Sequence, residues 1–224
     1  ASIYAAGSST QLTATVNGTV GNDAVAWTSG NTNIAKVSGG KVTGVGAGTV
    51  TITATSNGVS TSKSIQVKEP TIKLDRETAN IYPPATKTVT FTVTVNGVQG
   101  NSGVTWTTGN TKVATVSNGK VTAVGKGTAT ITAKANGKLA KAKVTVKDPY
   151  ANVSPTSGTI KVGKTLQLTT NYAPASTGTP SYSSSNKKVA TVDSKGVVKG
   201  VKAGTATITV KVNGVTAKAE ITVK

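Results

Sequence analysis

The acidic side chains are the first candidates for catalysis, because general acid–base chemistry often depends on them. The chain has seven acids, which are Asp23, Glu69, Asp75, Glu77, Asp148, Asp193 and Glu220. Asp75 and Glu77 flank Arg76 and are typical of an exposed strand edge. The remaining acids are dispersed along the chain, so the sequence does not predict the paired carboxylates with which a glycosidase flanks its substrate.

Histidine and cysteine are both absent, which removes the usual base of a nucleophilic triad and all thiol chemistry. A calcium site needs six to eight oxygen ligands, and the acids at the two repeat junctions, Glu69 and Asp148, have too few acidic neighbours. The Gly-x-Gly of VGAGT and VGKGT is no phosphate loop, because no helical pattern follows it. We therefore predict that the chain is not an enzyme and has no catalytic residues, metal site or cofactor.

Lysine sets the electrostatics of the chain, whose formal net charge is +18. Residues 1–68 carry four lysines and one acid, a net charge of +3, whereas residues 69–148 carry +7 and residues 149–224 carry +8. A positive field attracts anionic polymers, so we expect weak binding to an anionic cell-wall polymer or glycan. The candidate contacts are Lys138, Lys141, Lys143, Lys199, Lys202 and Lys218.

The alternative for these lysines is a solvated coat that keeps the protein soluble. They occur singly, with one arginine and few aromatics, whereas nucleic-acid readers favour bidentate arginine and aromatic stacking. We therefore expect no sequence-specific nucleic-acid binding. No run of about 18 apolar residues is present, so we also expect no membrane insertion.

One stretch occurs three times and sets the register of the chain. It reads VTGVGAGTVTITA at Val42–Ala54, VTAVGKGTATITA at Val121–Ala133 and VKGVKAGTATITV at Val198–Val210. In each copy two alternating segments flank a glycine turn, which indicates a β-hairpin. The predicted hairpin-turn glycines are Gly48, Gly127 and Gly204.

Each repeat also has one aromatic residue at a matching position, and these are Trp27, Trp106 and Tyr182. An apolar residue two positions earlier, Val25 or Val104, shares its face in the first two repeats and favours a core role. The alternative is a stacking platform for sugar rings. No helical segment is visible, since threonine and valine dominate and their branched side chains suit strands.

Proline marks the ends of the repeats. Val67-Lys68-Glu69-Pro70 and Val146-Lys147-Asp148-Pro149 are the same device, in which a strand ends and proline cannot continue the ladder. We predict domains at 1–68, 71–147 and 150–224, each a small β-sandwich, with linkers so short that the array is semi-rigid.

The repeats resemble the bacterial immunoglobulin-like domain of group 2. One family motif appears as VAWTSGNTNIAKV, VTWTTGNTKVATV and PSYSSSNKKVATV, and another as GKVTGVGAGTVTITA, GKVTAVGKGTATITA and GVVKGVKAGTATITV. The resemblance implies an all-β fold of three tandem Ig-like β-sandwich domains. It also implies roles in adhesin stalks, S-layer and cell-wall proteins, or phage tails and capsids, and it brings no catalytic residues. Repeat 3 departs from the motif at Tyr182, which follows Pro180.

These features predict a non-enzymatic structural or adhesive array of a bacterial cell-surface protein. It would be extracellular, with other domains of a longer parent chain or neighbouring subunits as partners. The alternatives are a phage virion protein whose modules contact the host surface, and a protein whose main role is polyanion binding.

The first repeat is expected to lack its leading strand. The second and third repeats carry the segments TIKLD and YANVSPT ahead of their shared core, whereas Ala1 already aligns within it. Either preceding residues of a longer polypeptide complete this domain, or a neighbouring chain donates the strand. In both cases the isolated first domain should be the least stable of the three, because its sheet has an open edge.

Overall fold

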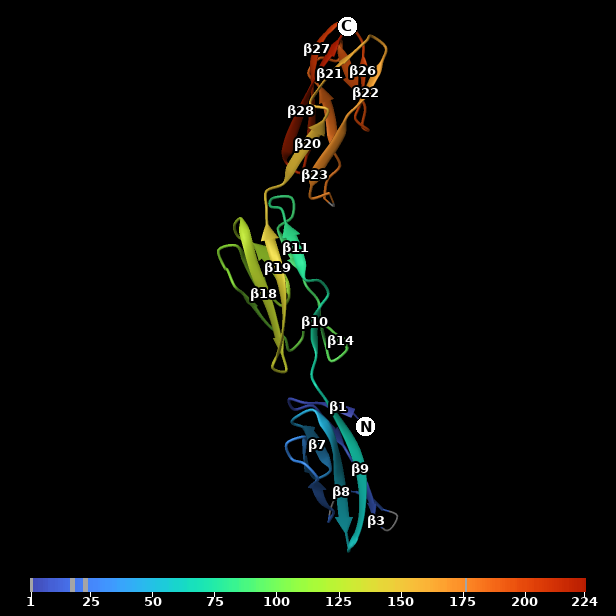
Figure 1. The fold of residues 1–224 in the computed structure, drawn as a ribbon, viewed down its shortest axis with the longest axis vertical. Coiled ribbons are helices and arrows are strands. Elements are labelled where there is room, and N and C mark those ends of the chain that lie inside the picture. Colours follow the sequence, from blue (N-terminus) through green and yellow to red (C-terminus); the bar gives the residue numbers. More distant parts are fainter. Residues whose placement is uncertain (1, 17–18, 22–23, 176) are drawn as a thin grey trace. The chain divides into compact units, whose positions relative to one another are not determined.

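The computed structural model describes residues 2–16, 19–21, 24–175 and 177–224 (Figure 1). Every helix or strand in this part of the chain is a β-strand, which confirms the all-β prediction. Within the same residues, no helix is long and apolar enough to cross a membrane. Asn17-Gly18, a residue pair typical of a tight turn, lies outside the described residues.

The chain divides into two compact units, and the division passes through the middle repeat. The first unit comprises residues 1–77, 91–107 and 132–142. The second comprises residues 78–90, 108–131 and 143–224. The first repeat therefore lies entirely in the first unit, and the third repeat lies entirely in the second.

The first repeat forms two sheets and a two-stranded ribbon. Its larger sheet has the order β1-β9-β8-β5, with β1 at Ser2–Tyr4, β9 at Val59–Lys68, β8 at Gly48–Ser56 and β5 at Ala26–Ser29. Its smaller sheet has the order β2-β7-β6, with strands at Ser9–Gln11, Lys41–Gly44 and Ala35–Ser38. The ribbon pairs β3 (Ala14–Val16) with β4 (Thr19–Gly21).

The third repeat has the same two sheets in the same order. The larger one is β21-β28-β27-β24, with strands at Ser157–Ile160, Val215–Val223, Gly204–Val212 and Ser181–Ser184. The smaller one is β22-β26-β25, at Thr165–Gln167, Val197–Gly200 and Ala190–Val192. A further pair joins β20 (Tyr150–Ser154) to β23 (Thr169–Ala173).

The middle repeat follows the same plan. Its four-stranded sheet is β11-β19-β18-β15, at Thr78–Ile81, Lys138–Val146, Gly127–Ala135 and Thr105–Thr108. One three-stranded sheet is β12-β17-β16, at Thr88–Thr90, Lys120–Ala123 and Ala114–Ser117. The other is β10-β13-β14, at Ile72–Leu74, Val93–Val95 and Val98–Gln99.

Alternation of side chains explains why the long strands form. In β27, GTATITVKV, the alanine, isoleucine and valines are buried while the threonines between them are not. Successive side chains of a strand point to opposite faces, so this segment buries one face. The long strands β8–β9 and β27–β28 then turn at Asn57-Gly58 and Asn213-Gly214. Both residues of each turn have positive φ, as a tight hairpin between twisted strands requires.

The predicted hairpin around Gly48, Gly127 and Gly204 is wrong. Each of these glycines begins a strand of the larger sheet, and the strand before it belongs to the smaller sheet, so the connection crosses between sheets. The error has a physical cause. Apolar and polar residues alternate along two strands that face each other across a core, just as they do along two strands that pair in one sheet. The glycine is still required: φ is +149° at Gly48, and a Cβ there would lie 2.8 Å from Ile34 Cδ1.

Among the described residues, the first repeat has no counterpart of the leading strands of the other two repeats, as the sequence predicts. In the third repeat β20 pairs antiparallel with β23, and in the middle repeat β10 pairs antiparallel with β13. The first repeat begins at β1, which pairs parallel with β9 as β21 pairs with β28. Within the described ranges β3 pairs with β4 alone, so its other edge has no strand beside it.

Candidate functional site

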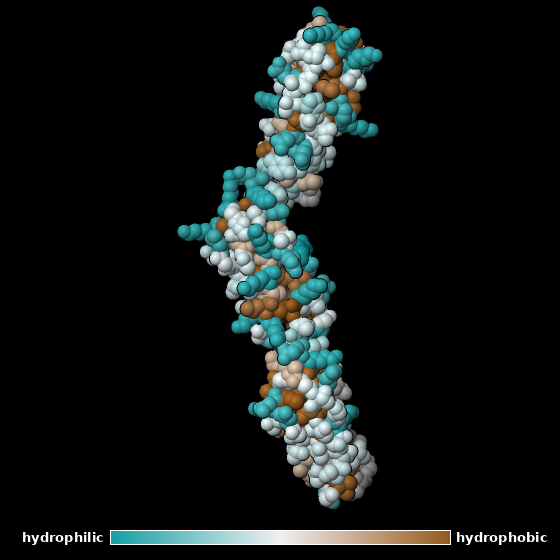
Figure 2. All heavy atoms as spheres, in the orientation of Figure 1, coloured by the Kyte–Doolittle hydropathy of each residue, from teal (hydrophilic) through white to brown (hydrophobic). Residues whose placement is uncertain are grey.

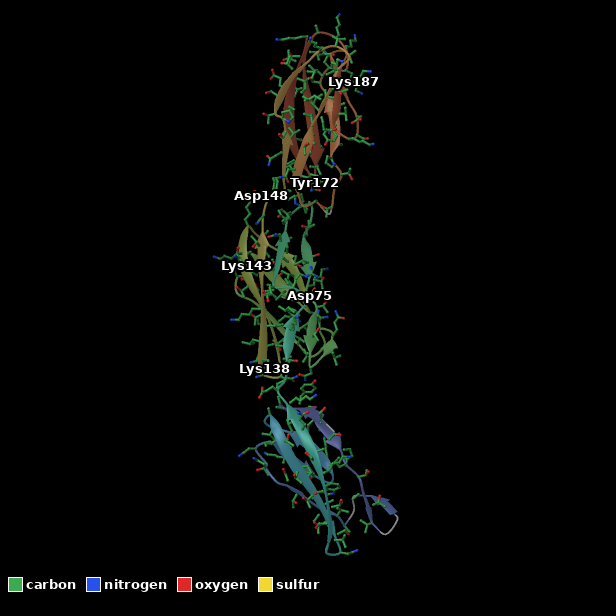
Figure 3. All side chains as sticks on the ribbon, turned by 45° about the vertical axis from the view of Figure 1, so that its right-hand side comes forward. Asp75, Lys138, Lys143, Asp148, Tyr172 and Lys187 are labelled. Carbon is green, nitrogen blue, oxygen red and sulfur yellow. The ribbon has the colours of Figure 1, made fainter. Side chains whose placement is uncertain are left out.

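The predicted lysine contacts of the middle repeat lie on its last strand, β19. Lys141 and Lys143 are exposed, and they alternate with buried Ala142 and Val144 on the opposite face. Lys138 is also exposed, but its Nζ lies 2.7 Å from the Glu69 carboxylate (Figure 3). An exposed ion pair of this kind stabilises weakly, yet it lowers the charge that Lys138 presents to an anion.

The structure does not gather the three predicted lysines of the third repeat. Lys199 lies on β26 in the smaller sheet, Lys218 on β28 in the larger sheet, and Lys202 in the connection between β26 and β27. All three are exposed. In the space-filling view, hydrophilic residues are likewise scattered over the visible face instead of forming one patch (Figure 2). This arrangement suits diffuse attraction better than a defined anion site.

The three predicted aromatic residues are all half-buried. Trp27 packs against the core cluster of the first repeat, and Tyr182 packs against that of the third. The Tyr182 hydroxyl and the Thr170 hydroxyl are 2.9 Å apart and form a hydrogen bond. The indole nitrogens of Trp27 and Trp106 are buried and have no hydrogen-bond partner among the described residues. Each ring therefore faces the interior with one side and leaves part of its surface accessible.

Asp75 has a specific electrostatic environment. Its carboxylate accepts hydrogen bonds from Arg76 Nη2 at 2.6 Å and from the Thr92 amide at 3.1 Å. Partial burial alone would raise the pKa of Asp75, but the hydrogen bond and charge of Arg76 and the Thr92 amide outweigh it, so the pKa is lowered. The guanidinium of Arg76 lies 5.8 Å from the centre of the Phe91 ring. These contacts hold the leading strand β10 against β13, which is a structural role.

Two of the remaining acids make contacts of their own. Asp148, labelled in Figure 3, forms an ion pair with Lys126. The Asp193 carboxylate accepts hydrogen bonds from the amides of Lys195 and Val197. No group of three or more metal-ligating side chains occurs in the described part of the chain. Asp23 lies outside the described residues.

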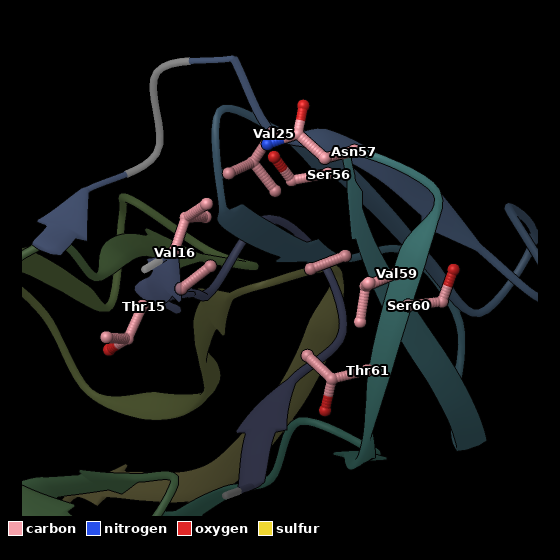
Figure 4. A pocket seen from close by; sticks show the side chains of 10 residues that line it. Thr15, Val16, Val25, Ser56, Asn57, Val59, Ser60 and Thr61 are labelled. Carbon is pink, nitrogen blue, oxygen red and sulfur yellow. The ribbon is translucent and has the colours of Figure 1, made fainter. Parts of the chain in front are cut away.

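One feature that the sequence did not predict is a groove in the first repeat, between β3 and β9 (Figure 4). Two adjoining hollows form it, with volumes of about 230 and 290 Å³. They share Ala14, Ala54 and Thr61, and Lys63 and Trp27 line the second. A signal was present in the sequence, because Thr61 and Lys63 take the places of Ala217 and Ala219 in the third repeat.

The strand order and pairing of these repeats define a class of protein, the immunoglobulin-like β-sandwich. The family model of the bacterial Ig-like domain (group 2) matches residues 1–67, 71–146 and 150–223. The chain therefore belongs to this family, with three tandem copies of its domain.

Similarity to individual proteins is more limited. A 3-O-alpha-D-galactosyl-alpha-L-arabinofuranosidase from Bifidobacterium longum subsp. longum is 56% identical over 52 residues, which are 22% of this chain and 5% of that protein. The S-layer protein rSbsC(31-844) is 22% identical over 89% of this chain and 35% of its own, with a TM-score of 0.38. Three N-terminal domains of the outer capsid protein Hoc of bacteriophage RB49 are 13% identical, with a TM-score of 0.43 over 99% and 95% of the chains.

Proposed function

We propose that the chain is a non-enzymatic array of Ig-like modules that spaces or displays other parts of a bacterial cell-surface protein. The observation that carries the proposal is the family match, whose three copies leave only residues 68–70, 147–149 and 224 unassigned. A chain composed of such modules, without histidine or cysteine, has little from which to build a catalytic centre.

The modules are proposed to work as part of a larger assembly. This chain spans 5% of the curated enzyme that it matches and 35% of the S-layer chain. Partners are accordingly other domains of a longer parent chain or neighbouring subunits. A catalytic domain on the same polypeptide is compatible with this role, because the array would then position that domain.

Antibody labelling of intact cells of the source organism tests the location. Labelling of intact cells, and loss of the label after brief protease treatment, is the expected result. Label that appears only after lysis would contradict a cell-surface role.

Recovery of the chain in purified virions instead would favour the alternative, a phage tail or capsid protein that contacts the host surface. Glycosidase activity of the purified chain alone would overturn the non-enzymatic proposal.

We also propose weak attraction to anionic cell-wall polymers through surface lysines. Support comes from the charge distribution, since residues 69–224 carry a net charge of +15, and from the exposure of Lys141, Lys143 and Lys218. Exposed charges are screened within about 8 Å at physiological ionic strength, so this binding should weaken steeply with salt.

Binding to immobilised teichoic acid or heparin tests this second proposal. Replacing Lys141, Lys143 and Lys218 with glutamine should weaken binding at low salt, whereas replacing Lys36, Lys41 and Lys63 of the first repeat should change it less. Binding that is insensitive to salt, or that depends on the first repeat, would contradict the proposal.

A further inference from the structure

Several asparagines of the chain are followed directly by glycine, and such a pair can modify itself. Glycine has no Cβ to shield its amide, so this nitrogen can attack the side-chain carbonyl of the asparagine before it. The fold decides which pairs react, because the asparagine must first leave its turn conformation and swing its side chain towards the backbone. The asparagines concerned are Asn17, Asn57, Asn96, Asn118, Asn136 and Asn213.

The reaction needs only water as a co-reactant. The glycine amide gives up its proton to water or hydroxide, and its nitrogen forms a bond to Cγ of the asparagine. The bond between Cγ and Nδ2 breaks, and the side-chain nitrogen leaves as ammonia with a proton from the solvent. Water then adds to one of the two carbonyls of the resulting succinimide ring. Opening of the ring gives either aspartate or isoaspartate, in which the main chain runs through the former side chain.

Asn136 and Gly137 form an exposed two-residue turn between β18 and β19 (Figure 1). Both have positive φ, +49° and +75°. The side chain of Asn136 makes no hydrogen bond to any residue in the described ranges. A Cβ at Gly137 would meet no heavy atom within 4 Å, so the space beside its amide is open. Exposed turns open locally at a small cost in free energy, and here no side-chain contact adds to that cost.

The matched turn of the third repeat, Asn213-Gly214, is held in place. Its φ values of +52° and +79° are nearly the same as those of the middle repeat. The half-buried Asn213 side chain donates a hydrogen bond from Nδ2 to the Pro174 carbonyl at 2.6 Å. Its Oδ1 accepts one from the Thr177 hydroxyl at 3.2 Å. Both bonds must break before Cγ can approach the glycine amide, so the same chemistry should be slower here.

Two further pairs are also restrained. Asn96 is half-buried, and its Oδ1 accepts a hydrogen bond from the Thr71 amide at 2.9 Å. Asn118 makes a contact of its own, and Gly119 beside it is buried. Asn57 lies at the rim of the groove in the first repeat, so the inference rests on the complete middle and third repeats.

We propose that Asn136-Gly137 is a spontaneous modification site, at which the folded chain converts to isoaspartate and aspartate ahead of the three restrained pairs. Isoaspartate adds a backbone atom to a two-residue turn, so the turn no longer fits the register of β18 and β19. Either product also places a carboxylate beside Lys138, which already pairs with Glu69. The site goes beyond the proposed spacer role, because it gives the middle repeat a chemical mark of age at the tip of its longest hairpin.

Incubation of the full chain at mildly alkaline pH, followed by peptide mapping and mass spectrometry, measures the conversion of each pair separately. Labelling with isoaspartyl methyltransferase identifies the isoaspartate product. In the folded chain, Asn136 should convert about fivefold faster, or more, than Asn96, Asn118 and Asn213. In concentrated urea this difference should fall to about twofold or less, because every asparagine then has the same glycine neighbour and no fixed hydrogen bond.

An Asn136→Gly variant is the matched control, since glycine adopts positive φ without strain and has no side-chain amide to lose. Ageing should speed hydrogen exchange near the turn in the unmodified chain but not in this variant. Equal conversion of the pairs in the folded chain, or faster conversion at Asn213, would overturn the proposal. A preference for Asn136 that persists in urea would overturn it too, because local sequence would then be the cause. So would a folded chain in which Asn136 stays intact after the urea-unfolded chain has converted.

Discussion

The first and third repeats share two sheets of identical strand order, but their cores differ in extent. The buried cluster of the third repeat has twelve members, and that of the first has eight among the described residues. Val153 accounts for one of the additional members, and Leu168 and Ala219 are buried where Leu12 is half-buried and Lys63 is exposed. The leading strand therefore does more than add its own side chains, because it also removes water from residues of its neighbours.

Truncation of a central isoleucine should give the largest difference in lost stability between the first and third repeats. Ile208 and Ile52 are equivalent and almost fully buried. Changing either residue to alanine should cost about 2–5 kcal/mol, and Ile208→Ala should cost more because its cluster surrounds it on more sides. Urea titration, monitored by hydrogen exchange and mass spectrometry, measures the loss of unfolding free energy in each repeat separately. Equal losses would mean that the leading strand does not tighten the core around this position.

Hydrogen exchange of the unmodified chain tests the open edge directly. Amides of Leu12–Val16 should exchange at least tenfold faster than those of Phe91–Val95 and Leu168–Tyr172, because a leading strand covers the latter two segments. Equal protection in the three segments would show that the first repeat closes without a leading strand.

The hydrogen bond between Tyr182 and Thr170 should contribute less. Tyr182→Phe removes it, and a typical net loss is about 0.5–1.5 kcal/mol. Thr170→Val leaves the tyrosine hydroxyl without this partner, and should cost at least as much. In the first repeat Ala14 takes the place of Thr170, so Trp27→Phe should not show this hydrogen-bond loss. Thermal unfolding of the single and double variants of Tyr182 and Thr170 measures the coupling, and additive effects would contradict it.

Acid should weaken the leading strand of the middle repeat but not that of the third. The pKa of Asp75 is lowered, so its contribution is present above the pKa of the unfolded chain and is lost as pH falls through the folded value. The contribution should not exceed about 1 kcal/mol, because the carboxylate and Arg76 are partly exposed. Hydrogen-exchange rates of the Phe91–Val95 amides at pH 6 and pH 3 measure this contribution, after correction for the intrinsic exchange rates. They are compared between the unmodified chain and the Asp75→Asn variant. A rate ratio that Asp75→Asn leaves unchanged would contradict this role.

The sequence predicts the features that depend on local pattern. Alternation in segments such as GTATITVKV is typical of long strands, and the Asn-Gly pairs at 57–58 and 213–214 are typical of the tight turns that the structure places there. Alignment of the repeats is enough to predict that the described residues of the first one hold no counterpart of β10 or β20. All of these depend on spacing along the chain, which the printed sequence contains.

Features that depend on pairing between distant segments could not be predicted. The strand after Gly48 alternates in the same way whether it pairs with its predecessor or faces it across a core, so the hairpin prediction was wrong. Lys138 meets Glu69 from a position 69 residues away, and only the folded chain brings them together. The position of Lys63 in the groove likewise requires the β8–β9 register, because alternation alone does not show that a neighbouring strand is absent.

In each repeat the last strand pairs parallel with a strand from the N-terminal part of that repeat, and this pairing determines how the repeat responds to pulling. β1 and β9 run in the same direction, as do β21 and β28, so tension applied at the two ends of a repeat slides these strands past each other. The hydrogen bonds between them are then loaded together in shear instead of opening one after another. The described ladder has three residue pairs in the first repeat and four in the third. Under mechanical load the first repeat should extend at the lower force and act as the weaker link of the array.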